Sequence, residues 1–326
     1  ALVSVVAAGA FVAAQPKARH NKVIALLEAK QPVFGLYAPS NRRFPGPPGS
    51  APATPPPPQK SPAQLAQEAA AYKLSDFVFD GSMEGGMDRA YPAFAEFSKA
   101  LAGAGILVKQ PSLHLTHPMI VKTPELRPDL AGAQAAIGKQ LNLGVSGVML
   151  VTVETAEEAR AGIAAMRFKS KGGVRPDDVG TAPAVWGMSE ADYRKKADVW
   201  PLNPEGELIN WTIVESKKGL ENLKEIAAVP GIGVLWPGAG TLRGVFSTQG
   251  ADGKRVLDEA AWENAIQSVL AACKANKIAC GFPANANDIE TRMKQGFNVF
   301  VMNWGDAGFK TVEAGRKIAG RTDTSQ

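Results

Sequence analysis

A carboxylate and a glycine-rich turn each follow an apolar segment, and together they could hold a metal ion or a small anion. Residues 208–214 are apolar and rich in β-forming side chains, and Glu215 follows them directly. A second apolar run, residues 232–236, ends in Pro237-Gly238-Ala239-Gly240-Thr241. Glycine places no Cβ in the way, so such a turn lets a ligand approach the backbone N–H groups. An ordinary βαβ unit with a surface glutamate fits the same residues equally well.

Two acidic residues follow another apolar segment, residues 75–79. Asp80 comes first and Glu84 four positions later, in the run Asp-Gly-Ser-Met-Glu-Gly-Gly. Glu84 could provide a second acid for a cation beside Glu215, because hard divalent ions usually take more than one acid from a protein. The alternative is an exposed loop glutamate.

Residues 113–122 contain one lysine and two histidines that could take part in chemistry. Lys122 ends the segment, and His114 and His117 lie earlier in it. An ammonium group can pair with a carboxylate as a point charge, and a histidine can act as a base or a metal ligand. Histidines inside strands are more often structural, so both interpretations of His117 stay open. Tyr37 and Thr152 lie at the ends of two further apolar segments and are active-site candidates without an assigned role.

The elements that must position these residues alternate along the chain. We expect strands at residues 32–37, 75–79, 113–122, 147–153, 208–214, 232–236, 278–282 and 299–303. Helical spacing of apolar residues predicts helices at 20–30, 63–72, 91–102, 131–141, 155–166, 217–228, 259–275, 288–294 and 310–318. Buried strands alternating with helices indicate an α/β fold, and eight units predict a (β/α)₈ TIM barrel with an N-terminal helix. Active sites of such barrels lie at the C-terminal ends of the strands.

The composition limits the possible domain organisation and the possible class of ligand. With 326 residues and 45% apolar content the chain can form one large core, expected over residues 19–320. Residues 41–62 are too rich in proline for regular structure and form a predicted insertion after the first strand, while residues 321–326 form a tail. The net charge is +5, but Lys and Arg are scattered, so we expect a small anionic ligand and no nucleic acid.

Residues 1–18 are small and apolar, and they are too short to span a bilayer. They resemble the end of a secretory signal, which predicts a periplasmic or secreted protein without a stable membrane span. The alternative is an N-terminal helix packed on the barrel of a cytoplasmic protein. Cys273 and Cys280 are too few for a disulfide framework or a cysteine zinc site, and their pairing is left open.

Three segments resemble the HpcH/HpaI aldolase/citrate lyase family, of the phosphoenolpyruvate/pyruvate-binding superfamily. They are GVSGVMLVTVETAEEARAGIAAMRF, WTIVESKKGLENLKEI and GIGVLWPGAGTL. The resemblance implies a (β/α)₈ barrel, a homo-oligomer and a carbon–carbon lyase. It also implies Mg²⁺, Mn²⁺ or Co²⁺ as a Lewis acid that stabilises a pyruvate enolate.

The resemblance assigns roles to several residues. Glu215 matches the metal-binding glutamate, and Gly238 and Ala239 match the loop that receives the pyruvate carboxylate. Asp80 matches the acidic start of the motif after the second strand and is taken as a second metal ligand.

This sequence departs from the family at other positions. Gly240 stands where the family has a second metal-binding Asp, and Met83, with Glu84 beside it, falls near the catalytic His. Lys122 falls near the carboxylate-binding Arg, Ile213 replaces a Gln, and Asn142 replaces an acid.

Two functional hypotheses follow. The first is a metal-dependent lyase acting on a 2-oxo or 2-hydroxy acid, with Glu84, Lys122 and His117 as catalytic candidates. The second is a barrel that has lost the metal and binds, or acts differently on, a small anionic or aromatic ligand. Metal binding separates them.

Overall fold

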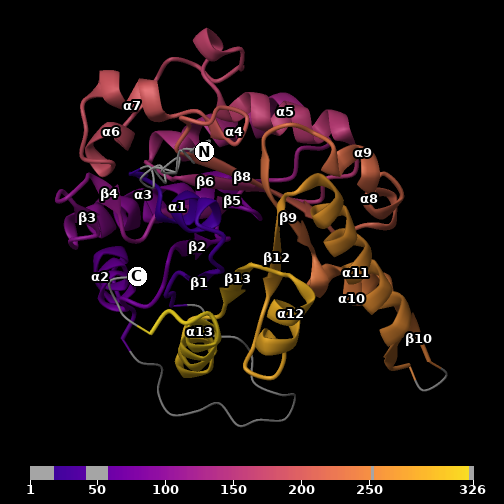
Figure 1. Ribbon diagram of the computed structural model, residues 1–326. Helices are drawn as coiled ribbons and strands as arrows, with labels where there is room; N and C mark the ends of the chain where they lie inside the picture. The colour runs from indigo at the N-terminus through magenta and orange to yellow at the C-terminus, as the bar shows by residue number, and fades with distance from the viewer. Residues whose placement is uncertain (1–17, 42–57, 251–252, 323–326) are drawn as a thin grey trace, which may run out of the picture.

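Eight parallel strands form a closed barrel in the computed structural model (Figure 1). The structure describes residues 18–41, 58–250 and 253–322. Around the barrel, each strand pairs with the next and the last returns to the first. The order is β1 (Val33–Tyr37), β2 (Val78–Asp80), β5 (Met119–Lys122), β6 (Gly147–Leu150), β8 (Leu208–Val214), β9 (Ile232–Pro237), β12 (Ala279–Pro283) and β13 (Val299–Met302). The predicted (β/α)₈ barrel is therefore confirmed.

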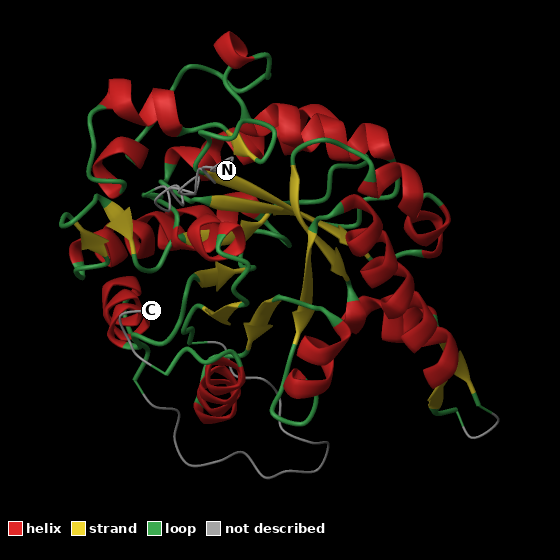
Figure 2. Cartoon of the chain, in the orientation of Figure 1, coloured by secondary structure: helices red, strands yellow, loops and turns green. Residues whose placement is uncertain are grey.

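Helices surround the strands (Figure 2). Several begin at a residue whose side chain accepts a hydrogen bond from the first turn, as Thr155 does for α5. The main ones are α2 (Pro62–Ala71), α3 (Met87–Gly103), α4 (Leu130–Asn142), α5 (Ala156–Met166), α8 (Lys217–Glu221), α9 (Leu223–Ala227), α10 (Ala239–Val245), α11 (Glu259–Asn276), α12 (Ile289–Gln295) and α13 (Asp306–Ile318).

Several short helices and strands lie outside the eight-stranded barrel. Residues 167–206 contain η1 (Lys169–Lys171), α6 (Ala182–Val185), α7 (Glu190–Lys196) and β7 (Val199–Trp200). Two antiparallel pairs lie outside the barrel: β3 (Leu107–Val108) with β4 (His114–Leu115), and β10 (Ser247–Gln249) with β11 (Arg255–Leu257).

Large aromatic side chains fill the barrel interior. Trp211 and Trp236 stack with ring centroids 5.5 Å apart, and Phe79 stacks on Trp211 at 5.9 Å. The N-terminal end of the barrel is closed by α1 (Lys22–Glu28). Its Val23 and Ile24 are fully buried and belong to the same group of packed interior side chains as Trp211 and Trp236. The helix predicted at residues 20–30 is confirmed. Since one end is filled, a ligand must enter from the C-terminal ends of the strands.

Glycines in neighbouring strands make room for these aromatic rings. A Cβ at Gly281 would lie 1.8 Å from Cε3 of Trp236, and a Cβ at Gly35 would lie 2.3 Å from the Phe77 ring. No real Cβ approaches another atom so closely. The interior therefore depends on glycine opposite a large side chain.

Two predicted elements are broken in the structure. The strand expected over residues 113–122 is wrong in its first half, since β4 pairs with β3 outside the barrel and β5 begins only after Pro118. Proline has no N–H to donate to a strand ladder. The helix expected over residues 217–228 is divided at Asn222, whose Nδ2 donates to the Glu154 carbonyl at 2.8 Å.

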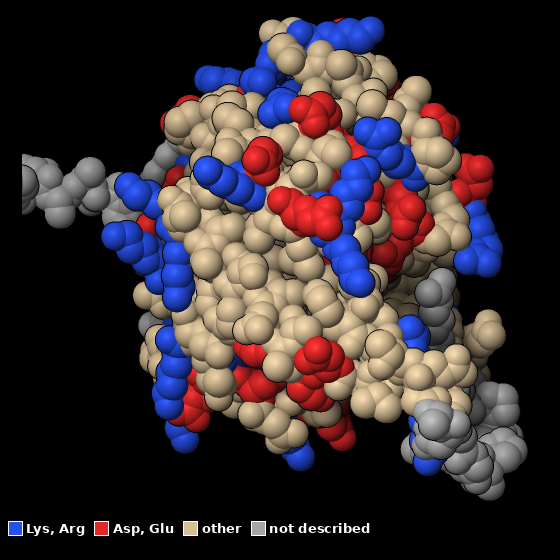
Figure 3. All heavy atoms as spheres, turned by 90° about the vertical axis from the view of Figure 1, so that its right-hand side faces the viewer, with Lys and Arg blue, Asp and Glu red and all other residues tan. Residues whose placement is uncertain are grey.

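Other features bear on the open questions from sequence. Cys273 and Cys280 form a disulfide that joins the end of α11 to β12. On the face in Figure 3, Lys and Arg side chains are interspersed with Asp and Glu. Within the described ranges, no helix combines the length and apolar character needed to cross a membrane. The predictions for residues 1–17, for most of the proline-rich insertion (42–57) and for residues 323–326 lie outside the described residues.

Candidate active site

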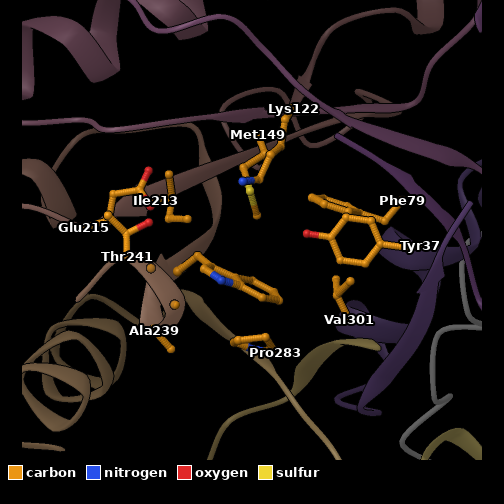
Figure 4. Close-up of a pocket in the computed structure, with 13 residues that line it drawn as sticks. Tyr37, Phe79, Lys122, Met149, Ile213, Glu215, Ala239, Thr241, Pro283 and Val301 are labelled. Carbon is orange, nitrogen blue, oxygen red and sulfur yellow. The ribbon is translucent and has the colours of Figure 1, made fainter. Parts of the chain in front are cut away.

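A cavity of about 190 Å³ opens at the C-terminal ends of the strands (Figure 4). Its apolar floor is the uppermost layer of the barrel interior, made of Phe79, Met149, Ile213, Trp236 and Val301. Its remaining lining residues are Tyr37, Lys122, Glu215, Gly238, Ala239, Gly240, Thr241 and Pro283. Figure 4 shows Glu215 and Thr241 on one side, Tyr37 and Phe79 on the other, and Lys122 and Met149 between them.

Glu215 is held rigidly where β8 ends. Its side chain is buried, with the residue 6% exposed. Oε1 accepts hydrogen bonds from the backbone N–H of Thr152 at 3.0 Å and from the Thr152 hydroxyl at 3.1 Å. Thr152 has φ +49°, a left-handed conformation that β-branched residues rarely adopt. That conformation directs the Thr152 N–H to Glu215, while the Thr152 hydroxyl lies between Oε1 of Glu215 and Oε1 of Glu125, the latter at 3.2 Å.

The predicted glycine turn is the start of a helix. Gly238 precedes α10, and its N–H donates to the Val214 carbonyl at 2.9 Å. A Cβ at Gly238 would lie 2.2 Å from Cβ of Glu215 and 2.6 Å from its Oε2, so glycine leaves room for this carboxylate. A Cβ at Gly240 would meet nothing within 4 Å. Pro237 is buried in β9 and does not line the cavity.

Lys122 and Glu84 form a pair above the floor. Nζ of Lys122 lies 3.0 Å from both carboxylate oxygens of Glu84, and the two side chains are 16% and 38% exposed. Lys122 lines the cavity, whereas Glu84 does not. The structure therefore brings Glu84 to Lys122 and not to Glu215, and its effect is to orient the ammonium group.

Asp80 and His117 are not brought to the cavity. Oδ1 of Asp80 accepts hydrogen bonds from the backbone N–H of Ser82 at 2.8 Å and from its hydroxyl at 2.5 Å, and Asp80 lines an adjoining cavity. His117 precedes β5, at the opposite end of that strand from Lys122, and is 1% exposed. Its Nε2 contacts the Tyr72 carbonyl at 3.0 Å, and burial lowers its pKa to about 4. These contacts fit the structural interpretation of His117.

Tyr37, a candidate because it ends a predicted strand, lines the cavity. It ends β1, and its ring meets Phe79 edge to face with centroids 5.0 Å apart. Burial raises the pKa of Tyr37, while Lys122 acts in the opposite direction. The sequence placed Tyr37 and Thr152 at strand ends, but their orientation depends on the registers of β1 with β2 and of β6 with β8. No local motif carries that information.

The donor set for a divalent cation is small. Glu215 is the carboxylate among the lining residues, and Oε1 already accepts two hydrogen bonds from Thr152. Across the part of the chain that the structure describes, no three His, Cys, Asp or Glu side chains gather in a group that could hold a metal ion. Hard divalent ions usually take more than one acid from a protein. These side chains do not fit a resident divalent cation.

Comparison with known proteins agrees with the sequence resemblance. The family model described as HpcH/HpaI aldolase/citrate lyase matches residues 89–312. A hydroxypyruvate/pyruvate aldolase of Cupriavidus necator is 29% identical over 157 residues, which cover 48% of this chain and 55% of that protein. A 2-dehydro-3,6-dideoxy-6-sulfogluconate aldolase of Pseudomonas putida is 30% identical over 112 residues, 33% of this chain and 38% of that protein. The chain spans about half the length, or less, of these curated relatives.

A solved structure shows the same fold. An HpcH/HpaI aldolase/citrate lyase family protein from Burkholderia cenocepacia superimposes with a TM-score of 0.62. The superposition covers 92% of this chain and 98% of that one at 20% sequence identity. At this identity the likeness concerns the fold.

Proposed function

Because the chain belongs to the HpcH/HpaI aldolase/citrate lyase family, we propose that it is a carbon–carbon lyase. It would cleave or form the bond between the methyl carbon of a pyruvate-type 2-oxo acid and the carbonyl carbon of an aldehyde. The aldolase names of the curated relatives support this reaction class. They do not favour the alternative of a ligand-binding barrel without lyase activity.

One observation carries the proposal: a small cavity places a fixed cation and a fixed carboxylate over an apolar floor. Lys122 is oriented by Glu84, and Glu215 is oriented by Thr152. A volume of about 190 Å³ equals the liquid volume of roughly six water molecules. That space suits a small 2-oxo acid together with a small aldehyde.

The charged lining residues have different proposed roles. Lys122 attracts the carboxylate of the 2-oxo acid, and this contact is present in the ground state and the transition state alike, so it contributes mainly to binding. The buried Glu215 carboxylate can accept a proton or ligate a cation. A divalent metal, Mg²⁺, Mn²⁺ or Co²⁺, stays a prediction drawn from the family resemblance.

An aldol assay tests the function. The purified full-length protein is incubated with pyruvate or hydroxypyruvate and glycolaldehyde, with each of the three metals and without metal, and products are followed by NMR. We expect a 4-hydroxy-2-oxo acid to accumulate. Absence of this product with both donors under every metal condition would contradict the proposal.

We further propose an oxidising location and a homo-oligomer. The first is supported by the Cys273–Cys280 disulfide, because disulfides persist in secreted and periplasmic proteins. The second rests on the family resemblance alone.

A further inference from the structure

We propose that Tyr37 is the catalytic acid and base at the aldehyde oxygen. It donates its phenolic proton to that oxygen as the carbon–carbon bond forms, and its phenolate takes the proton back when the bond is cleaved. The inference rests on the proposed lyase function and adds to it a residue for which the family resemblance gives no role.

The geometry places the Tyr37 hydroxyl at the reacting space. Tyr37 pairs in register with Phe79 of β2, and the ring of Phe79 holds the tyrosine ring edge on. Figure 4 shows the hydroxyl pointing away from the strand into the cavity, across from Glu215. Among the described residues, the hydroxyl has no hydrogen-bond partner. A fixed ring with a free hydroxyl is arranged to bind a ligand oxygen.

Apart from Glu215, which lies across the cavity, the other groups that could transfer a proton are engaged by a partner or lie outside the cavity. The Lys122 ammonium is engaged by both oxygens of Glu84. The chain has three histidines, and none of them lines the cavity. Met83, where the family resemblance places the catalytic histidine, is fully buried and outside the lining. A phenol, whose ordinary pKa is about 10, can donate a proton and is stable as an anion next to a cation.

Charges around Tyr37 fit the direction of transfer. Burial raises the pKa of Tyr37, and the carboxylates of Glu84, Asp80 and Glu215 act in the same direction. The phenol is therefore protonated near neutral pH and available as a donor. Lys122 lowers the pKa and so stabilises the phenolate that donation leaves behind. A Cβ at Gly81 would lie 3.5 Å from Cδ of Lys122 and 3.7 Å from Cε1 of Tyr37, so both side chains flank this one glycine.

The step balances without another reactant. The nucleophilic carbon of the pyruvate enolate bonds to the aldehyde carbon, and the π electron pair of the carbonyl moves to its oxygen. That oxygen takes the proton from Oη of Tyr37, which becomes a phenolate and regains a proton from water. Cleavage follows the reverse course: the phenol first gives its proton to hydroxide, and the phenolate then removes the substrate hydroxyl proton while the carbon–carbon bond breaks.

Two assays on the full chain separate this step from formation of the enolate. The first measures addition of pyruvate to glycolaldehyde. The second measures exchange of the pyruvate methyl protons in D₂O without aldehyde, which reports enolate formation alone. The variant is Tyr37→Phe, which keeps the ring on Phe79 and removes the hydroxyl. Tyr91→Phe, on α3 outside the cavity, is the matched control.

We expect Tyr37→Phe to slow addition by a factor of about 10² or more, the usual contribution of a positioned acid or base. Exchange should stay within about threefold of wild type, and Tyr91→Phe should match wild type in both assays. Addition by Tyr37→Phe within threefold of wild type would overturn the inference. Equal loss of addition and exchange, in a variant with wild-type circular dichroism and melting temperature, would also overturn it. A wild type inactive in both assays would instead defeat the proposed function, and the inference with it.

Discussion

At the scale of single residues, the site depends on one carboxylate whose position is fixed by an unusual backbone conformation. Thr152 adopts a left-handed φ, and its N–H and hydroxyl both reach Oε1 of Glu215. Such conformations cost of order 1 to 3 kcal/mol and persist where the surrounding structure enforces them. The charge on Glu215 is therefore presented to the cavity in one orientation.

Replacement of Glu215 by glutamine tests the importance of that charge. Glu215→Gln keeps the shape of the side chain, but an amide neither accepts a proton nor ligates a cation as well as a carboxylate does. We expect kcat for aldol addition to fall by about 10² to 10³, as for loss of one electrostatic group in comparable sites. Steady-state kinetics measure this, and a melting temperature close to wild type serves as the control. Unchanged kcat would exclude a role for Glu215 in catalysis.

Gly240 provides a test of the missing metal ligand. A Cβ at this position meets nothing within 4 Å, so the start of α10 can accept a side chain. Gly240→Asp supplies the acid that the family resemblance leads us to expect, and we predict tighter Mn²⁺ binding by calorimetric titration. Gly240→Asn, of the same shape without the charge, is the control. Equal Mn²⁺ affinity in all three proteins would show that Glu215 and residue 240 do not share a cation.

The sequence identified part of the site because some signals are local. Glu215 and residues 238–241 follow apolar strands directly, and the structure brings them together. Glu84 and Asp80 also end up at the C-terminal face, but their partners, Lys122 and Ser82, are decided by loop geometry that no motif encodes. Tyr37 was found only as a strand end, since the direction of its hydroxyl depends on its packing against Phe79.

At the scale of elements, the barrel interior depends on pairs of glycine and aromatic residues. A Cβ at Gly281 would overlap the Trp236 ring at 1.8 Å, and Trp236 is also part of the cavity floor. We expect Gly281→Ala to destabilise the protein by about 1 to 3 kcal/mol, the usual range for overpacking a core. Urea unfolding measures the change.

The matched control for this prediction is Gly103→Ala in α3. A Cβ there meets nothing within 4 Å, and alanine favours a helix over glycine. This variant should be neutral or stabilised by up to about 1 kcal/mol. Equal stability of Gly281→Ala and wild type would show that the strands adjust around Trp236 at little cost.

The strength of the local pattern explains which elements were predicted well. The strand expected at residues 208–214 is β8 to the residue, because this mostly apolar run of β-branched and aromatic side chains is bounded by Glu207 and Glu215. Residues 113–122 are also mostly apolar, yet only Met119–Lys122 join the barrel. The pairing of β4 with β3 is a contact outside the barrel that periodicity cannot reveal. The division at Asn222 likewise depends on a distant partner, the carbonyl of Glu154.

At the scale of the whole molecule, two buried histidines link stability to pH. His20 is 1% exposed and its ring lies 4.8 Å from that of Trp186, centroid to centroid. His117 is equally buried beside the Tyr72 carbonyl. Burial lowers the pKa of each to about 4 in the folded protein, below the ordinary value of 6.5. Both are neutral in the fold at pH 5, whereas the unfolded chain protonates them.

The sign of the effect follows from proton binding. Between about pH 4 and pH 6.5 the unfolded state binds more protons than the folded state, so the free energy of unfolding rises with pH and falls on acidification. From pH 7 to pH 5 the expected loss is about 2 kcal/mol for each histidine. Urea unfolding at pH 7, 6 and 5 measures it. His117→Gln removes one titrating group and should roughly halve the loss, even if the variant is less stable at pH 7. A free energy of unfolding that is constant from pH 7 to pH 5 would mean that both rings accept protons inside the fold, which their burial among Trp186, Tyr72 and the surrounding core argues against.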